Sequence, residues 1–199
     1  LPVVMFDPPD FTDPATCDNE FLLQSSLWAC MLGERRGSYE FDEYGRMVIP
    51  AADVDAQAVS LFGQNIKLEH MTIGDMENAY QYDSDIASYH VPIIAMTGFA
   101  TPSVEKIVMK QDSCQLTVGY VPPTTVLSIN YDSKGNLEET PSKYMLYELR
   151  KNGKDFYLYS VTTIMNDSVS GTEFNTGTVG RVDTLTSSDS QGGGNTQAP

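Results

Sequence analysis

Apolar residues near the start of the chain recur at helical spacing. The broad face they form contains Phe21, Leu23, Leu27, Trp28, Cys30 and Met31. Asp13 precedes Pro14, and an N-cap followed by proline at the first helical position is a common helix start. We therefore predict a helix over residues 13–32. So wide an apolar face indicates burial against a sheet.

A second helical pattern follows Pro50. Val54, Ala58, Leu61 and Phe62 fall on one side of residues 51–62. Asp53 and Asp55 suit the positive end of a helix, and Gly63 is a natural C-terminal stop. The pattern predicts a helix over residues 51–62.

From about Met71 the apolar spacing shifts towards two, which is typical of strands. Three pairs of strand-like segments flank short turns and predict hairpins: 79–82 with 89–91, 104–110 with 114–121, and 144–150 with 156–161. The last turn contains Asn152-Gly153, the pair preferred in a two-residue type I′ turn. Residues 39–50 predict a short hairpin or an ordered loop, and residues 126–131 predict one more strand.

These elements predict one α+β domain over residues 13–165. Its N-terminal helices would pack on a C-terminal antiparallel β-sheet, a meander of hairpins. We expect residues 1–12 to be an extended N-terminal segment. Residues 166–199 are rich in Ser, Thr, Gly, Asn and Asp, so they predict a polar flexible tail, with Val179, Val182 and Leu185 as material for one extra strand.

The chain is acidic, with 27 acidic and 12 basic residues and a net charge of -15. Residues 1–77 carry 14 acids and 4 bases, a balance of -10, so most of the excess lies in the helical front half. No cluster of Lys and Arg is present, which argues against nucleic-acid binding, and the charge disfavours direct docking on an anionic membrane. It is compatible with a basic protein partner or with a solubility role alone.

The cysteines and the chain start bear on the compartment. Cys17, Cys30 and Cys114 form no C-x-x-C motif, and we interpret them as small buried hydrophobes. Residues 1–6 are apolar but too short to cross a bilayer, and no basic segment precedes them. We expect any signal or anchor to have been removed upstream of Leu1.

No group of side chains predicts a catalytic site, a cofactor site or a metal site. His70 and His90 lie twenty residues apart on predicted sheet segments, and nothing in their spacing forces them to converge. No G-x-S-x-G motif is present, and Cys114 falls within a predicted strand. We therefore expect a protein that is not an enzyme.

The paired carboxylates do not change this expectation. Asp42-Glu43, Asp53 with Asp55, and Asp83 with Asp85 reflect the acidic composition. Residues 130–136 have the spacing of a calcium loop, but Lys134 stands at a ligand position and Pro141 stands where a bidentate Glu belongs. We interpret that segment as a turn.

Tyrosine is abundant on the predicted strands: Tyr80, Tyr82, Tyr89, Tyr120, Tyr144, Tyr147, Tyr157 and Tyr159. Tyrosine packs well within sheets, and it also supplies contact area with one polar tip on binding surfaces. The sequence leaves both interpretations open.

The run from Asp42 to Val54, with Leu61-Phe62-Gly63 and the tyrosines of the last hairpin, resembles an uncharacterised family of exported or membrane-anchored proteins of gut Firmicutes. The resemblance covers about residues 10–165 and implies an extracytoplasmic location, in the cell envelope or secreted. The order of helices before a meander is also similar to cystatin-like and nuclear-transport-factor-like folds, and to bacterial inhibitors of cell-wall endopeptidases. Neither resemblance supplies catalytic residues.

Three hypotheses of function follow. The first is a non-catalytic extracytoplasmic interaction module that regulates or inhibits an envelope protein, steered by electrostatic complementarity. The second is a small-molecule-binding domain with a pocket between helices and sheet. The third is a hydrolase with scattered catalytic residues, which would need a pocket that joins His70 or His90 to a carboxylate and a nucleophile.

Overall fold

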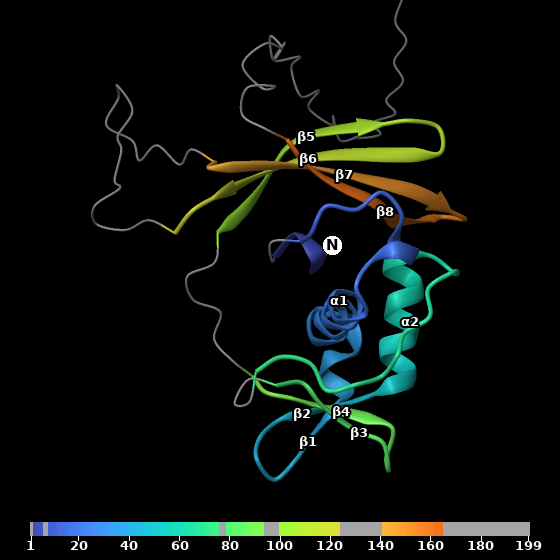
Figure 1. The fold of residues 1–199 in the computed structure, drawn as a ribbon, viewed down its shortest axis with the longest axis vertical. Helices are drawn as coiled ribbons and strands as arrows, with labels where there is room; N and C mark the ends of the chain where they lie inside the picture. The colour runs from blue at the N-terminus through green and yellow to red at the C-terminus, as the bar shows by residue number, and fades with distance from the viewer. Residues whose placement is uncertain (1, 6–7, 76–78, 94–99, 124–140, 165–199) are drawn as a thin grey trace, which may run out of the picture.

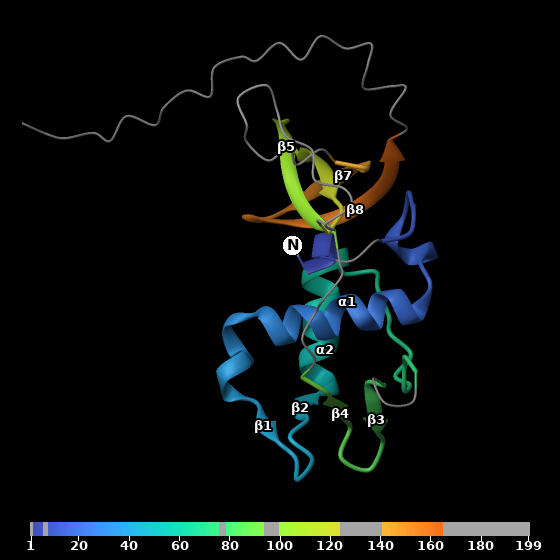
Figure 2. The ribbon, with the colours of Figure 1, turned by 90° about the vertical axis from the view of Figure 1, so that its left-hand side faces the viewer.

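The protein has two antiparallel sheets with two helices between them. The computed structural model describes residues 2–5, 8–75, 79–93, 100–123 and 141–164. Figures 1 and 2 show a large sheet on one side, a small sheet on the other, and the helices in the middle layer. The α+β class predicted from the sequence is confirmed.

The described elements include three 3-10 turns, two helices and eight strands. The 3-10 turns are η1 (Pro2–Met5), η2 (Pro14–Thr16) and η3 (Glu34–Ser38), and the helices are α1 (Asn19–Leu32) and α2 (Ala51–Phe62). The strands are β1 (Glu40–Phe41), β2 (Met47–Pro50), β3 (Gln81–Asp83), β4 (Ser88–Val91), β5 (Thr101–Met109), β6 (Ser113–Val121), β7 (Lys143–Asn152) and β8 (Asp155–Ile164).

The large sheet is the predicted meander, with strand order β5-β6-β7-β8. Both of its predicted short-turn hairpins are present. The turn of the second hairpin differs from the prediction, because Asn152 pairs with Asp155 and leaves Gly153-Lys154 as the central residues. Gly153 has φ 64°. Type I′ and type II′ turns share a positive φ at the first central residue, but type I′ also needs one at the second, and Lys154 is not among the described residues with positive φ. The turn is therefore of type II′ instead of type I′.

The predicted packing of N-terminal helices on a C-terminal antiparallel sheet is confirmed only in part, because the described strands form two sheets. Residues 39–50 form the hairpin β1–β2, and β2 pairs with β4 to build a separate sheet of order β1-β2-β4-β3. In that pairing Ile49 lies opposite Tyr89, forty residues later. The helices therefore lie between two sheets. In this position the helical layer covers apolar side chains of both sheets.

The two helices were predicted with different accuracy. The bounds of α2 match the prediction, and the chain turns after it at Gly63. The predicted first helix is broken at Cys17, so Asp13 caps only η2, with its carboxylate accepting from the Ala15 N–H. Asp18 is the N-cap of α1 and accepts from the Glu20 N–H at 2.7 Å. Cys17 itself has an extended backbone, with φ -70° and ψ 153°, and this separates η2 from α1.

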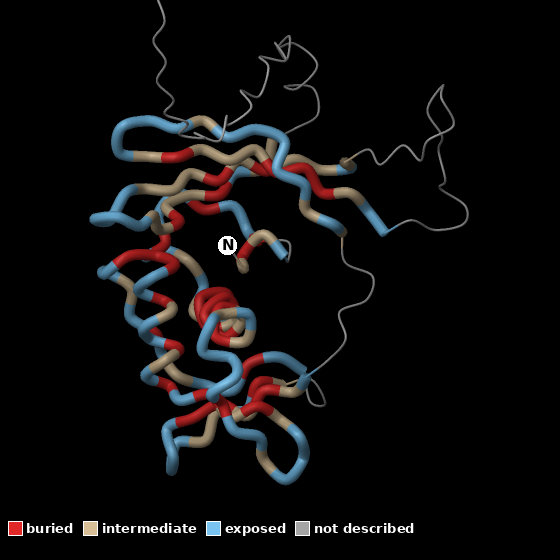
Figure 3. The backbone as a smooth tube through the Cα atoms, turned by 180° about the vertical axis from the view of Figure 1, so that it is seen from behind, coloured by how far each residue is buried: buried red, intermediate tan, exposed pale blue. Residues whose placement is uncertain are grey.

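One continuous apolar core joins all three layers. Leu23 and Leu27 of α1, Val54 of α2 and Tyr89 of the small sheet are fully buried, and so is Tyr147 of the large sheet. Figure 3 shows buried positions in the helices and in both sheets. The mutual burial of layers that are apolar on facing sides holds the sheets and helices together.

The segment predicted to be an extended N-terminal region contributes to this core. Val3 of η1 is fully buried, and Phe11 is 8% exposed. Phe11 and Val161 exchange two backbone hydrogen bonds of 2.9 Å, which extends the edge of β8 by one bridge. Among the described residues, no helix has the length and apolar character needed to span a membrane.

β5 is an edge strand, and one of its two rows of side chains lies on the core-facing side of the large sheet. The register places Val104 opposite the fully buried Val118 and Met109 opposite the buried Cys114. A β-bulge between Val104 and Lys106 brings Ile107 to the same face. Although this face points towards the core layer, Val104, Ile107 and Met109 are 54%, 60% and 61% exposed. The apolar face of β5 therefore extends beyond the part that the described residues cover.

Candidate functional site

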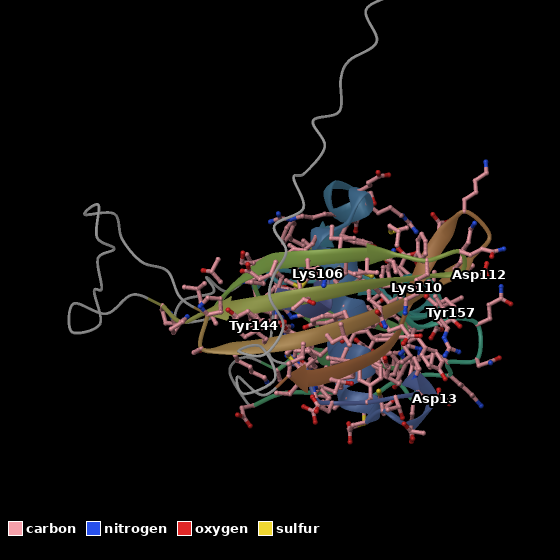
Figure 4. The ribbon with its side chains drawn as sticks, turned by 90° about the horizontal axis from the view of Figure 1, so that it is seen from above. Asp13, Lys106, Lys110, Asp112, Tyr144 and Tyr157 are labelled. Atoms are coloured by element: carbon pink, nitrogen blue, oxygen red, sulfur yellow. The ribbon has the colours of Figure 1, made fainter. Side chains whose placement is uncertain are left out.

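A groove lies where the tip of the β7–β8 hairpin meets the end of α2. We call it the hairpin groove. It encloses about 480 Å³ and is lined by residues 13–15, 62–66, 150–152, 157 and 159. Three segments that are distant in sequence build it, and polar side chains form most of its surface. In Figure 4, which views the large sheet from above, Asp13 and Tyr157 lie at the same end of the molecule, and Tyr144 lies at the other.

Arg150 and Tyr159 form one wall of the hairpin groove. The guanidinium carbon of Arg150 lies 3.1 Å from the centre of the Tyr159 ring. Arg150 Nε also lies 3.4 Å from Glu148 Oε1. Stacking on an aromatic face and a carboxylate partner together restrict the arginine while leaving it 43% exposed. The wall therefore presents a positioned cation with donors available to a ligand.

Tyr157 and Gly63 form the floor beside this wall. Gly63 has φ 92°, and its N–H donates to Val59 O at 2.9 Å at the end of α2. A Cβ at position 63 would lie 3.1 Å from Cδ2 of the Tyr157 ring. The glycine is needed both for its backbone conformation and for this close approach. The end of α2 is thus fixed against the hairpin that carries Arg150.

Asp13 supplies the groove with a negative charge. Its carboxylate accepts from the Ala15 N–H at 3.0 Å, and its carbonyl accepts from the Thr16 N–H at 3.0 Å. Lys151 adds a second positive charge, and the amide side chains of Gln64, Asn65 and Asn152 are also among the lining residues. The groove therefore offers both signs of charge together with neutral donors and acceptors.

A second groove of about 570 Å³ borders the end of η2, and we call it the N-terminal groove. Residues 9–12, 16–18 and 161–162 line it. Cys17 is its one thiol, and burial, followed by the nearby charges of Asp13 and Asp18, raises the pKa of that thiol to about 11. A thiol with this pKa is protonated at neutral pH, so Cys17 is not positioned as a nucleophile.

The two histidines lie on opposite faces of the small sheet. His70 Nδ1 lies 3.0 Å from the hydroxyl of the buried Tyr89, and its Nε2 lies 3.3 Å from Asp55 Oδ1. His90 Nδ1 lies 2.8 Å from Asp42 Oδ2 on the outer face. Each histidine has a carboxylate neighbour, but they do not converge, and neither lines the hairpin groove or the N-terminal groove.

Two of the candidate carboxylates, Asp42 and Asp83, contact the same His90 ring: Asp42 Oδ2 lies 2.8 Å from Nδ1, and Asp83 Oδ2 lies 4.0 Å from Nε2. Asp42 lies in the β1–β2 turn, where Arg46 Nε lies 2.7 Å from its Oδ2. Asp53 pairs with Arg35, and Asp83 accepts from the Asp85 N–H within the β3–β4 turn. Over the described ranges, no three His, Cys, Asp or Glu side chains are grouped as they would be to hold a metal ion. Residues 130–136, with the predicted calcium-like spacing, fall outside the described residues.

Desolvation acts to raise the pKa of Asp42, but hydrogen bonds from Arg46 and His90 outweigh it. The Arg46 backbone N–H donates to Oδ1 at 2.9 Å, and the Tyr44 N–H donates to the same oxygen at 2.9 Å. Together these donors hold the pKa of Asp42 well below its usual range. The carboxylate is therefore ionised at neutral pH and fixes the turn.

The cysteines and tyrosines divide by burial. Cys30 and Cys114 are buried as predicted, Cys17 is partly exposed, and all three are free. Four of the strand tyrosines are buried in the core: Tyr80, Tyr89, Tyr120 and Tyr147. Tyr157 and Tyr159 line the hairpin groove instead. Core packing therefore accounts for these four tyrosines, and the recognition-surface interpretation stays a prediction for Tyr157 and Tyr159.

Comparison with protein-family models, with curated proteins and with solved structures finds no match to this chain. The resemblance to exported proteins of gut Firmicutes and to inhibitor-like layouts stays a prediction. The functional argument rests on the geometry of the site.

The sequence did not predict the hairpin groove. The only signal within it was the tyrosine content of the last hairpin, which the sequence analysis could not separate from core packing. The positions around Gly63 were interpreted as a helix end, and those around Asp13 as a helix cap. Their proximity to Arg150 depends on tertiary contacts.

Proposed function

We propose that this domain is a non-catalytic interaction module that binds a short polypeptide segment of a partner protein in the hairpin groove. The observation that carries the proposal is the positioned Arg150, stacked on Tyr159 and lying in one groove with Asp13. Tyrosine and arginine dominate the energetics of many protein interfaces. A groove with both signs of charge and amide side chains suits a polypeptide, whose backbone and side chains offer matching groups.

The partner we propose is a basic protein of the cell envelope. A net charge of -15 raises the encounter rate with a positively charged protein, and this steering weakens as salt is added. The acidic side chain of Asp13 would then hold a basic side chain of the bound segment, and Arg150 an acidic side chain or a terminal carboxylate. We propose that this binding regulates or inhibits the envelope protein.

The location outside the cytoplasm is part of the same proposal and rests on the resemblance alone. Protease treatment of intact host cells tests it. Loss of the protein from intact cells supports the proposed location, and a protein protected until lysis contradicts it.

Selection of peptides from a random displayed library tests the binding function directly. We expect enriched peptides to bind the whole chain and to lose at least tenfold in affinity when Arg150 or Tyr159 is replaced by alanine. Lys154→Ala is the matched control, because it removes a cation from the same hairpin outside the groove lining. NMR shifts of the amides of Gly63 and Asn152 should follow peptide addition.

The proposal fails if no peptide is enriched, or if enriched peptides bind the Arg150→Ala and Tyr159→Ala variants as well as the wild type. Equal loss in the Lys154→Ala variant would indicate attraction to charge in general and would also contradict a specific groove.

The volume of the hairpin groove favours one second candidate, the binding of a small molecule. At about 480 Å³ it falls in the range of ligand pockets, roughly 300–1,000 Å³. A thermal-shift screen of polar metabolites separates the two candidates. Stabilisation that disappears in the Tyr159→Ala variant would favour the small molecule. No observation on the described residues favours the hydrolase.

A further inference from the structure

We propose that β5 is a self-recognition strand, through which two copies of this chain pair edge to edge in antiparallel orientation and join their large sheets. This inference concerns the opposite edge of the sheet from β8 and is independent of the hairpin groove. Among the described residues, β6 is the only strand paired with β5, so the outer edge of β5 has no strand partner there. In Figure 3 most of β5 is exposed.

The first argument is the unusual exposure of apolar side chains on the core side of β5. Val104, Ile107 and Met109 are each more than half exposed, although the register aligns them with buried residues of β6. Large apolar side chains gathered on one face indicate an interaction surface. A second sheet joined at this edge would continue the face and cover these side chains.

The second argument is that the strand is self-complementary, and that the β-bulge makes it so. Antiparallel pairing about the bond between Glu105 and Lys106 places Val104 opposite Ile107 of the second copy and Pro102 opposite its Met109. Opposite residues of an antiparallel pair share a face. Because the bulge brings Val104 and Ile107 to the same face, all of these apolar pairs fall on the core side.

The same register pairs opposite charges at its centre. Glu105 of each copy lies opposite Lys106 of the other, which gives two cross-strand charge pairs about the two-fold axis. Opposite charges directly across a strand pair stabilise it, and like charges destabilise it. The two bulges also face each other, so the number of residues on the two strands remains equal.

Pro102, Lys106 and the bulge are features that discourage edge strands from pairing indiscriminately. A partner strand of another sequence would meet an unmatched lysine and an irregular backbone. A second copy of β5 places Glu105 opposite the lysine and its own bulge opposite the irregular backbone. The features that protect this edge against other strands therefore select the same strand.

The third argument is the local charge. Two identical acidic proteins repel each other, but residues 101–113 contain two acids, Glu105 and Asp112, and two bases, Lys106 and Lys110. The strand and its following turn are therefore neutral in a chain of net charge -15. Figure 4 labels Lys106 on β5 and Lys110 and Asp112 at the turn that follows it. A neutral edge is where two copies approach with least local repulsion.

Sedimentation velocity of the full chain from micromolar to hundreds of micromolar tests the proposal. At about 0.15 M salt, where long-range repulsion is screened beyond about 8 Å, we expect a reversible monomer–dimer equilibrium. Lys106→Glu places carboxylates opposite each other twice and should weaken association at least tenfold. The double variant Glu105→Lys with Lys106→Glu restores opposite charges across the axis and should recover association.

Two further variants complete the test. Lys154→Glu makes the same charge change at the tip of the other hairpin and should leave association within about threefold of the wild type, because distant surface charges act only through screened repulsion. Ile107→Glu should abolish the dimer, and since this side chain is already 60% exposed, the fold should survive, as circular dichroism can verify.

A chain that sediments as a monomer at every concentration overturns the proposal. So does a dimer that persists in the Lys106→Glu variant, equal weakening by Lys154→Glu, or a double variant that fails to associate. Peptide binding in the hairpin groove can be measured on the Ile107→Glu variant, so failure of this proposal and of the proposed function are distinguishable.

Discussion

At the scale of single residues, hydrogen-bonded carboxylates fix the turns of this protein. Asp42 illustrates the point, since two backbone N–H groups and two side chains surround its carboxylate. The side chain is 12% exposed, and it links the β1–β2 turn to His90 on the central strand β4. One carboxylate therefore connects three of the elements at the outer surface of the small sheet.

We predict that Asp42 makes the stability of the protein depend on pH in the acid range. Its folded pKa is depressed below the unfolded value of about 3.9, so its contribution is fully present above about pH 5. The contribution is lost as the pH falls below that unfolded value and through the folded pKa. The difference in unfolding free energy between wild type and Asp42→Asn should shrink as the pH is lowered from neutral.

Urea unfolding at a series of pH values measures this difference. Glu43→Gln is the matched control, because it removes an exposed carboxylate from the same turn. A wild-type advantage over Asp42→Asn that stays constant down to the acid transition would contradict the assignment.

At the scale of elements, the end of α2 shows how a local conformation supports the hairpin groove. Gly63 combines φ 92° with ψ 171°, a region that residues with a side chain rarely occupy. We predict that Gly63→Ala destabilises the fold by about 1–3 kcal/mol, because backbone strain adds to the close approach of Tyr157. Gly37→Ala should change stability by less than about 0.5 kcal/mol, since a Cβ there meets no atom within 4 Å.

Denaturation midpoints of the two variants measure the effect. Because Gly63 positions the floor of the groove, the Gly63→Ala variant should also bind selected peptides less well at temperatures where it remains folded. A variant as stable as Gly37→Ala would show that Gly63 is not needed for its conformation.

Local patterns predicted the elements well and their arrangement less well. Periodicity predicted the bounds of α2. Together with turn residues, it predicted the ends of the strands in the last two hairpins to within a few positions. The pairing of β2 with β4 does not, because Ile49 and Tyr89 are distant in sequence and nothing local selects their register. The bulge in β5 also hid the apolar face of that strand, since Val104 and Ile107 have opposite parity.

The candidate site was less predictable for the same reason. Arg150 and Tyr159 are brought together by strand pairing, but Asp13 and Gly63 reach them only when the middle layer packs on the large sheet. Their local signals describe a cap and a helix end. Sequence reasoning therefore identified what each residue does for its own element and could not identify the groove they share.

At the scale of the whole molecule, the core is continuous from one sheet to the other through the helices. We predict that the described domain unfolds in one cooperative transition. The helical layer packs on both sheets, so loss of either sheet would expose apolar side chains of the helices. The single tryptophan, Trp28, donates to the Tyr80 hydroxyl at 3.0 Å and reports on the small-sheet side. Its fluorescence and the far-ultraviolet circular dichroism should give coincident urea transitions.

Hydrogen exchange of Thr117 in β6 and His90 in β4 extends this test to both sheets. Similar global protection is expected at the two positions. Separate midpoints, or early exchange confined to one sheet, would mean that the molecule consists of two units that fold independently.

The bridge between Phe11 and Val161 has a consequence for the size of any assembly. A sheet with two open edges can add copies without limit, as fibres do. Here the side of β8 away from β7 is already engaged, by the Phe11 backbone and by the Asp10 carboxylate, which accepts from the Thr163 N–H at 2.9 Å. In two chains joined through β5, the outer edges of the combined large sheet would be the two β8 strands, each engaged at Val161 and Thr163, so we expect growth of this sheet to stop at a closed pair.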